Sequence, residues 1–596
     1  MASTEYVGGS GKLNEVINVA NDTLDQDQQL TIYLQHDITL AEDIDAINTA
    51  GVILITPAPG LTSVTIDGAG KYRGFIVLSG DVRLSGLRIH QARASGPDGC
   101  LGAGGGLFVA NVTDARGQLP KKQESDPDQV GNPYFPKGGK GSVSLTGVTF
   151  TNCSAVGGKA MEGGGKGAAG GSGGGPFTDP NGGFPAPATP FPGGRAALGY
   201  PLGPRHAGYF GVVGSGGRSV AGGRQEDARA RVDASGKPGS PGGQGGYGAA
   251  GGVGGGGGGG AGGAGHFPSL GRGPGGPPSV SGSIGGAGGA CGTAGYGAGT
   301  GGTTHLNASD PEQGKATEGS YGGAGGKGGD GAPGGGGAGL GGAVFAMSGA
   351  SLSWTGSGSI SAGQVAGGQS GPGSASGTAV GAGMYLEGSG VLTFGPDQGA
   401  TCTVGDPIVD ETGVVSAIPA TTTPPGPDGL STRGGTGSWR VVVARAGTLT
   451  LRGPHAFTGG FLINGATDAK YVTELNLSDY SNAVKNDLLL CGNAMLTYRP
   501  SSGEGTQLAL TTITSGPQPL LSARFALNAH SSVTADEMRL TELRIVLNPD
   551  DFIPGTPVDV LRTQKPIGPE FTVSVSQGFD RAIVNQNTIR VTRNKP

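Results

Sequence analysis

The sequence contains few charged and few aromatic residues. Of its 596 residues, 14% are charged and 5% are aromatic, and the formal net charge is −5. Lysine and arginine never gather in a run, so the chain lacks the basic patch typical of nucleic-acid binding, and we predict no nucleic-acid partner. It also lacks a stretch of about 18 apolar residues, so we predict that this chain does not insert into a membrane.

Cysteine is scarce as well. The five cysteines are far apart and odd in number: Cys100, Cys153, Cys291, Cys402 and Cys491. No C-x-x-C motif occurs, which argues against a zinc or redox site. Isolated cysteines typically act as small buried residues, so we expect buried thiols, with a disulfide such as Cys100–Cys153 as the alternative.

Two further patterns are missing near the start of the chain. The opening MASTEYVGGSGKLNEVINVAND has neither the basic nor the apolar region of a secretory signal, so either a leader has been removed or export uses another route. Helical periodicity is nearly absent from the whole sequence, and KLNEVINVAND (12–22) is the one short helix candidate.

The chain instead offers glycine and short alternating strands. Glycine accounts for 130 residues, and runs such as LTIYLQHDITL (30–40), GVILIT (51–56) and VRLSGLRIH (82–90) alternate apolar with polar side chains. Period two, with β-branched residues and Gly, Asp or Ser between the runs, predicts short β-strands.

These strands belong to a repeating unit. Small glycines followed by an apolar triplet recur in residues 102–111, 339–349 and 381–390, and paired alternating runs recur in residues 82–96, 142–158 and 351–368. A unit of strand, turn, strand, small tail, glycine loop and strand is typical of a right-handed parallel β-helix, in which each coil bonds to its neighbours. Glycine at the corners supplies backbone angles that other residues avoid. We therefore predict an all-β solenoid.

Between residues 157 and 340 the composition changes. Glycine occupies every third position in several tracts, the longest being Gly242, Gly245, Gly248, Gly251, Gly254, Gly257, Gly260 and Gly263. Too little proline is present for collagen, which leaves a flexible loop or a polyglycine-II-like layer, and the unbroken period favours the layer. We predict N-terminal coils in 1–156, a glycine-rich insertion in 157–340, and C-terminal coils with a cap in 341–596.

One segment resembles a known family. GTLTLRGPHAFTGGFLINGAT (447–467) is similar to the repeat of autotransporter passengers, with matches at Gly447, Thr448, Leu449, Thr450, Leu451, Gly453, Phe457, Thr458, Gly459, Gly460, Ile463, Asn464 and Gly465. SVSLTGVTFTNCSAVGGKA and GGDGAPGGGGAGLGGAVF resemble haemagglutinin-like bacterial surface adhesins. The resemblance implies a right-handed parallel β-helix outside the cell that acts in adhesion or as a surface scaffold. Since no leader precedes Met1 and no membrane barrel follows Pro596, we expect a processed passenger or an excised secreted part.

Parallel β-helices also include polysaccharide lyases and hydrolases, whose carboxylates gather on one face. The candidates here are Asp406, Asp410 and Glu411 in VGDPIVDET, and Asp550 and Asp551 in NPDDF. We interpret both groups as solvated turns.

We accordingly predict no catalytic, cofactor-binding or metal-binding residue. The histidines share no metal-ligand spacing and are expected to be surface or hydrogen-bonded residues: His36, His90, His206, His266, His305, His455 and His530. Trp354, Tyr385 and Phe394 are expected to form an internal aromatic stack, with a sugar-stacking platform as the alternative.

The predicted function is that of a secreted, non-enzymatic bacterial surface structural protein or adhesin. We expect it at the cell surface, associated with the outer membrane after secretion, and self-assembled into filaments or a matrix, or bound to cell-surface carbohydrate. The alternatives are a β-helix polysaccharide lyase or hydrolase and, third, a phage tail fibre or tailspike.

Overall fold

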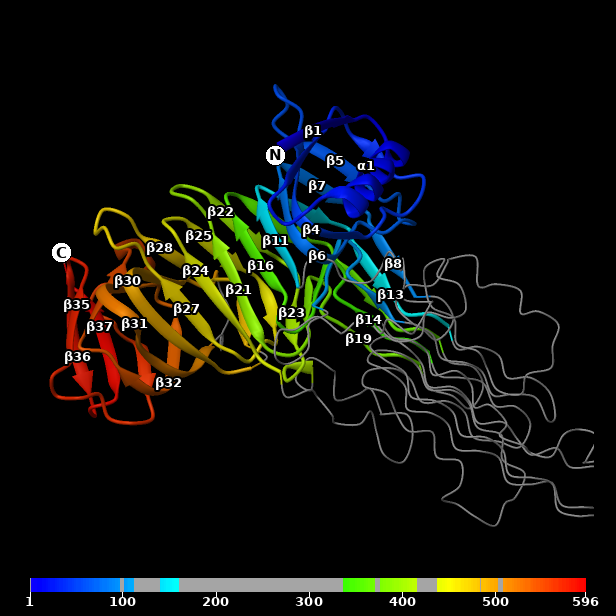
Figure 1. Ribbon diagram of the computed structural model, residues 1–596. Coiled ribbons are helices and arrows are strands. Elements are labelled where there is room, and N and C mark those ends of the chain that lie inside the picture. Colours follow the sequence, from blue (N-terminus) through cyan, green and yellow to red (C-terminus); the bar gives the residue numbers. More distant parts are fainter. Residues whose placement is uncertain are drawn as a thin grey trace, which may run out of the picture.

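The computed structural model describes residues 2–96, 101–111, 140–159, 336–369, 376–414, 437–482, 484–501 and 507–595. These residues form an all-β architecture with a large, mainly parallel sheet, which is consistent with the predicted solenoid. Strands succeed one another along the molecule in sequence order (Figure 1). Residues 160–335, most of the predicted glycine insertion, lie outside the described residues. The prediction of a flexible loop or a polyglycine-II-like layer concerns these residues and therefore stays a prediction.

The longest run of paired strands, here called the long ladder, extends from the first strand to the C-terminal hairpin. Its neighbours are parallel until the last two pairs, which are antiparallel. In ladder order it contains β1 (Ala2–Val7), β2 (Gln29–Leu34), β4 (Ile47–Pro57), β6 (Phe75–Ser85), β11 (Gly141–Thr146), β16 (Ser351–Thr355), β21 (Gly390–Gly395), β24 (Trp439–Ala444), β27 (Phe461–Asn464), β30 (Asn486–Tyr498), β31 (Gln507–Leu527), β32 (Ser532–Arg539), β34 (Pro557–Thr563), β37 (Thr588–Arg593) and β36 (Phe579–Val584).

A second ladder runs beside it, and each of its pairs is parallel. It contains β3 (Ile38–Thr39), β5 (Val64–Asp67), β7 (Leu87–His90), β12 (Thr149–Thr151), β17 (Gly358–Ser361), β22 (Thr401–Val404), β25 (Thr448–Leu451), β28 (Thr473–Asn476), the C-terminal parts of β30 and β31, β33 (Glu542–Leu547) and β35 (Thr572–Val575).

The remaining strands form shorter parallel groups. A short ladder joins the start of β6 to β10 (Leu107–Val109), β15 (Val344–Ala346), β20 (Met384–Leu386) and β23 (Ile408–Asp410). A first flank sheet contains β8 (Arg93–Ser95), β13 (Ser154–Val156) and β18 (Gln364–Ala366), and a second contains β9 (Gly102–Ala103), β14 (Gly339–Leu340) and β19 (Ala379–Val380). β26 (Gly453–His455) pairs with β29 (Tyr480–Asn482).

The predicted repeats occupy equivalent places in successive coils. The apolar triplets of β10, β15 and β20 are paired in register, so that Leu107 lies beside Val344, and Val344 beside Met384. The glycine before the triplet turns the chain each time with positive φ, 65° at Gly341 and 70° at Gly381. The sequence alignment of these segments is therefore also their spatial alignment.

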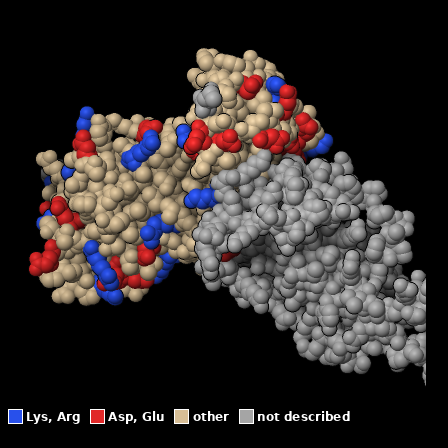
Figure 2. Space-filling model, in the orientation of Figure 1, with Lys and Arg blue, Asp and Glu red and all other residues tan. Residues whose placement is uncertain are grey.

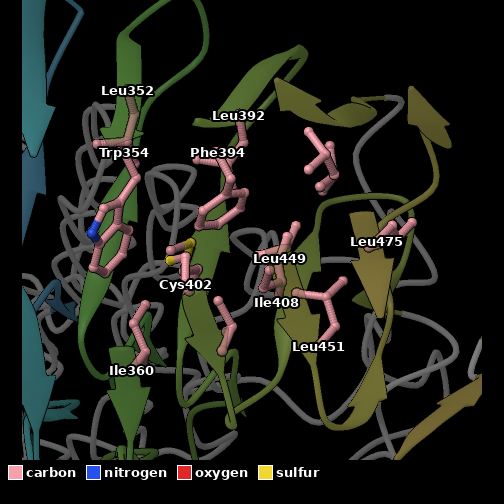
Figure 3. Close-up of a cluster of buried hydrophobic side chains, with 14 of the residues drawn as sticks. Leu352, Trp354, Ile360, Leu392, Phe394, Cys402, Ile408, Leu449, Leu451 and Leu475 are labelled. Atoms are coloured by element: carbon pink, nitrogen blue, oxygen red, sulfur yellow. The ribbon is translucent and has the colours of Figure 1, made fainter. Parts of the chain in front are cut away.

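Side chains from successive coils stack into two cores. In the larger one, Trp354 of β16 lies over Phe394 of β21, with ring centroids 5.9 Å apart (Figure 3). In the smaller one, Phe345 lies between Phe108 and Tyr385, at 4.9 and 5.6 Å. The prediction of one stack is thus wrong for Tyr385, because alternate strand positions direct these rings to different cores. All three predicted rings are fully buried, which excludes a sugar-stacking platform.

The two flank sheets pack backbone against backbone. A Cβ added to Gly102 would lie 2.2 Å from the carbonyl oxygen of Val156, and one on Gly157 would lie 1.8 Å from that of Gly337. Hydrogen bonds cross directly between the layers, since the amide of Gly337 donates to the carbonyl of Gly158 at 2.9 Å. Such close approach requires residues without side chains, which explains the glycines at the borders of the insertion.

The predicted helix is present near the start of the chain. α1 (Ser10–Thr23) buries Leu13, Val16 and Ile17 against the N-terminal end of the larger core. The C-terminal end carries a 3-10 turn, η1 (Pro549–Asp551), and the antiparallel β36–β37 hairpin.

Candidate functional site

Asp410 is the most constrained carboxylate of the described residues. It is the last residue of β23 and is fully buried. Its Oδ1 accepts a hydrogen bond from the Gly413 amide at 2.8 Å, and its Oδ2 accepts from the Trp439 amide at 2.9 Å and from the amide and hydroxyl of Thr458 at 2.6 and 3.0 Å. The carboxylate thus holds together three separate segments of the chain.

The interpretation of VGDPIVDET as a solvated turn is therefore wrong for Asp410 and Glu411, because both are buried. Burial raises the pKa of Asp410, and the bonds from Thr458, Trp439 and Gly413 oppose that shift by stabilising the ionised form. With both oxygens engaged, this carboxylate is suited to structure and not to proton transfer.

Glu387 lies next to this structural carboxylate. Leu386 pairs with Asp410 at the end of the short ladder, and Glu387 and Glu411 are the residues that directly follow these two strand ends. The Oε2 atom of Glu387 is buried without a hydrogen-bond partner in the described part of the chain. Burial, and then the charge of Glu411, raises the pKa of Glu387 to about 7. Glu387 and Glu411 form what we call the glutamate pair.

His455 packs close to this region. Its Nδ1 accepts a hydrogen bond from the Ile408 amide at 3.1 Å, and its Nε2 lies 3.0 Å from the Arg452 carbonyl, so the proton is on Nε2. The ring is fully buried and stacks on Tyr480 at 5.5 Å. Burial lowers the pKa of His455 to about 4, so it is a neutral, hydrogen-bonded residue, as predicted for the histidines.

The other predicted carboxylates lie elsewhere. Asp406 is half-buried, and its Oδ2 accepts from the Gly363 amide at 2.8 Å. Asp550 and Asp551 are exposed on η1, so the prediction of a solvated turn is confirmed for this pair. The two groups of candidate carboxylates therefore differ in burial, since Asp410 and Glu411 are buried and Asp550 and Asp551 are exposed.

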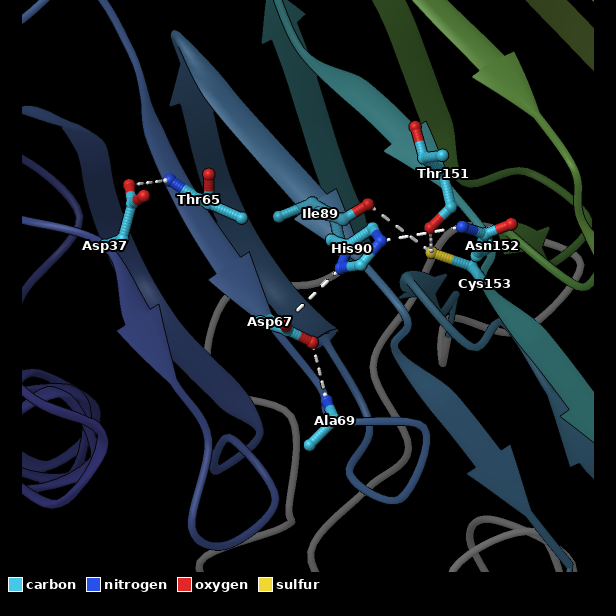
Figure 4. A network of polar contacts seen from close by, with 9 residues as sticks. All are labelled: Asp37, Thr65, Asp67, Ala69, Ile89, His90, Thr151, Asn152 and Cys153. Carbon is cyan, nitrogen blue, oxygen red and sulfur yellow. Dashed lines mark hydrogen bonds and ion pairs between the residues drawn. The ribbon is translucent and has the colours of Figure 1, made fainter.

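A second polar cluster surrounds His90 at the end of β7 (Figure 4). His90 Nδ1 lies 3.4 Å from Asp67 Oδ2, and its Nε2 lies 3.5 Å from the side-chain nitrogen of Asn152. The neighbouring Cys153 would complete a nucleophile–histidine arrangement, but its Sγ donates to the Ile89 carbonyl at 3.6 Å. Burial raises the pKa of Cys153 to about 12, so the thiol stays protonated and is no nucleophile.

The remaining predictions can be placed briefly. Cys153, Cys402 and Cys491 are buried free thiols, as expected, whereas Cys100 and Cys291 lie outside the described residues. His36 and His530 are exposed, and His206, His266 and His305 lie in the undescribed part. In the ranges that the structure describes, no three His, Cys, Asp or Glu side chains are grouped so as to hold a metal ion. Among the helices of those same ranges, none is long and apolar enough to cross a bilayer.

Sequence reasoning missed Glu387, although a signal was present. In the three aligned glycine repeats, the position after the triplet is Ala110, Met347 and Glu387. A carboxylate at a position occupied by apolar residues in the two preceding coils marks a departure from the repeat.

The fold therefore defines an all-β, mainly parallel class of protein, and the glutamate pair is an unusual chemical feature of its described residues. Comparison with family models, curated proteins and solved structures finds no match to this chain.

Proposed function

We propose that this protein is an extracellular bacterial surface scaffold or adhesin, built as a right-handed parallel β-helix with a polyglycine-II-like insertion on one flank. The observation that carries the proposal is the long ladder, which continues through both the N-terminal and C-terminal coils. A rod of this kind extends its binding surface along its whole length, as solenoids do. The passenger-like segment 447–467 supports it, because its matched residues alternate between the consecutive strands β25, β26 and β27 and the turns that flank them.

The interior chemistry also supports a structural role. Asp410 accepts hydrogen bonds from the amides of Trp439 and Thr458, and His455 accepts one from the amide of Ile408. These bonds join different coils, so the two residues stabilise the stack. Detection of the native protein on intact cells by protease shaving, together with rods in electron micrographs of the purified full chain, tests the proposal. A protein recovered only from the cell interior would contradict it.

The glutamate pair favours a second candidate function, a carbohydrate-active β-helix enzyme. An acid whose pKa is about 7 beside another carboxylate is the arrangement that glycoside cleavage uses. Pectin, alginate and capsule polysaccharides incubated with wild type and with Glu387→Gln test it. Product release by the wild type alone would establish the enzyme, and equal inactivity of both proteins would leave the scaffold.

A further inference from the structure

We propose that copies of this chain associate head to tail, with the outer edge of β36 in one copy pairing with the outer edge of β1 in the next. The proposal deepens the self-association included in the proposed scaffold function, and it rests on that function. It names the partner, a second copy, and the two strands that meet.

The long ladder ends in strands of equal length and direction. Within the described ranges, β1 pairs only with β2, and β36 pairs only with β37, and each contains six residues. β36 is antiparallel to β37, which is antiparallel to β34, so β36 runs in the direction of the parallel strands. A junction between β36 and β1 would therefore be a parallel pair like those within the ladder.

The faces of the two strands also match. Glu5 and Val7 of β1 lie beside Ile32 and Leu34, which point into the larger core. Likewise, Arg581 of β36 lies beside the buried Val591, and Ile583 lies beside Ile589. Because strand side chains alternate between faces, a register that pairs Glu5 with Arg581 and Val7 with Ile583 keeps both cores on the same side.

The two ends differ in charge. Acidic side chains gather on the lobe that holds the N-terminal coils (Figure 2). Up to residue 50 the chain has one lysine, Lys12, against Glu5, Glu15, Asp22, Asp25, Asp27, Asp37, Glu42, Asp43 and Asp45. The C-terminal end is close to neutral, since from residue 548 on it carries Arg562, Lys565, Arg581, Arg590, Arg593 and Lys595 against Asp550, Asp551, Asp559, Glu570 and Asp580. Repulsion between two acidic N-terminal ends therefore disfavours their contact and favours head-to-tail contact, in which Glu5 meets Arg581.

Both edges leave part of their length open to pairing. Proteins commonly block free strand edges with proline, lysine, an inward-pointing charge, a bulge or a covering segment. β1 contains neither proline nor lysine, and Tyr6 is 52% exposed, but Val7 at its end is fully buried next to α1. Glu5 and Arg581 are charges on the core side of their strands, so each opposes pairing with a like edge, and a junction between them pairs the two charges. In β36, residues 580–583 are exposed, including Ile583 at 44%. A head-to-tail contact between unlike surfaces leaves a free edge at each end and extends into an open filament wherever its rotation does not close a ring.

Sedimentation velocity of the full chain over rising concentration tests the proposal, at low salt and at about 0.5 M salt, where charge attraction is screened. We expect a distribution that shifts to larger species with concentration and returns towards monomer in salt. Glu5→Arg alone and Arg581→Glu alone should each shift the apparent dissociation constant upward by at least tenfold. An equimolar mixture of these two variants should assemble again. In a filament where the two variants alternate, the Arg581 of one variant meets the unchanged Glu5 of the other, and at the next junction the two substituted positions meet with opposite charges.

A matched charge change away from the ends, Arg88→Glu on β7, should leave assembly unchanged. Far-UV circular dichroism confirms that each variant is folded, and recovery in the mixture excludes misfolding as the cause of a loss. Assembly of the single variants equal to wild type, or no recovery in the mixture, overturns the proposal. A wild type that stays monomeric also overturns it, whereas surface location and rod shape would still support the scaffold function.

Discussion

Replacement of Glu387 by glutamine should make the protein more stable at pH 8 and should remove part of its pH dependence. The Oε2 atom of Glu387 is buried and unpaired, and Glu411 directly follows the end of the adjacent strand β23. Glutamine has the shape of the protonated acid and carries no charge, so it keeps the packing and removes the cost of ionisation.

The sign follows from the two pKa values. Folding raises the pKa of Glu387 from 4.5 to about 7, so the native state binds more protons than the unfolded state between these values. The favourable contribution is complete below pH 4.5 and is lost as the pH rises through 7. The pKa difference of about 2.5 corresponds to at most about 3.4 kcal/mol, and partial exposure of this side chain reduces the expected effect to about 1–2 kcal/mol.

Urea unfolding of both proteins at pH 5, 6, 7 and 8 measures this effect. The stability difference, Glu387→Gln minus wild type, should increase by about 1–2 kcal/mol between pH 5 and pH 8. Glu542→Gln, at an exposed position of β33, serves as the matched control and should show no such trend. A difference that stays constant with pH would refute the buried, unpaired state of Glu387 and with it the acid proposed for the enzyme alternative.

Three further predictions concern the coils themselves. Gly102→Ala places a Cβ 2.2 Å from the Val156 carbonyl and should lower the unfolding free energy by about 1–3 kcal/mol in urea melts, whereas Gly568→Ala, with open space around it, should change it by less than about 0.5 kcal/mol. In Asp410→Asn, the new NH2 group faces the donor of Gly413 in one amide orientation and those of Trp439 and Thr458 in the other, so the unfolding free energy should fall by about 2 kcal/mol in urea melts. The exposed Asp550→Asn should not change it measurably. Cys153 and Cys402, whose pKa values burial raises to about 12, should react with a thiol reagent only after denaturant is added, and rapid reaction of either in the native protein would contradict their burial.

The repetitive part of the fold could be predicted from the sequence because repeat and structure share one period. The alignment of residues 102–111, 339–349 and 381–390 needed only small residues at turns and apolar residues at strand positions, and both are local properties. The same reasoning failed at Asp410, because its partners Trp439 and Thr458 follow 29 and 48 positions later. The residues next to a carboxylate in the sequence therefore do not show whether it lies in an exposed loop or is buried by a later coil.

The separation of the aromatic residues has a similar origin. Trp354, Phe394 and Tyr385 all occupy apolar strand positions, which predicts burial and contact with rings in neighbouring coils. The assignment to one core or two depends on the alternation of side chains in the short ladder, where Met384 and Leu386 of β20 face the larger core and Tyr385 between them faces the smaller one. All three residues of this triplet are apolar, so the sequence does not distinguish its two faces.

Glycine also explains how a coil can accept insertions of very different length. In each of three successive coils, a strand of the first flank sheet is followed in the sequence by a strand of the second. The undescribed residues 97–100, 160–335 and 370–375 come between these two strands in the three coils. In the second and third of these coils, hydrogen bonds join the chain on either side, from the Gly337 amide to the Gly158 carbonyl and from the Gly377 amide to the Gly368 carbonyl at 3.1 Å. Since these bonds close the coil whatever lies between them, the ladders continue in register on both sides.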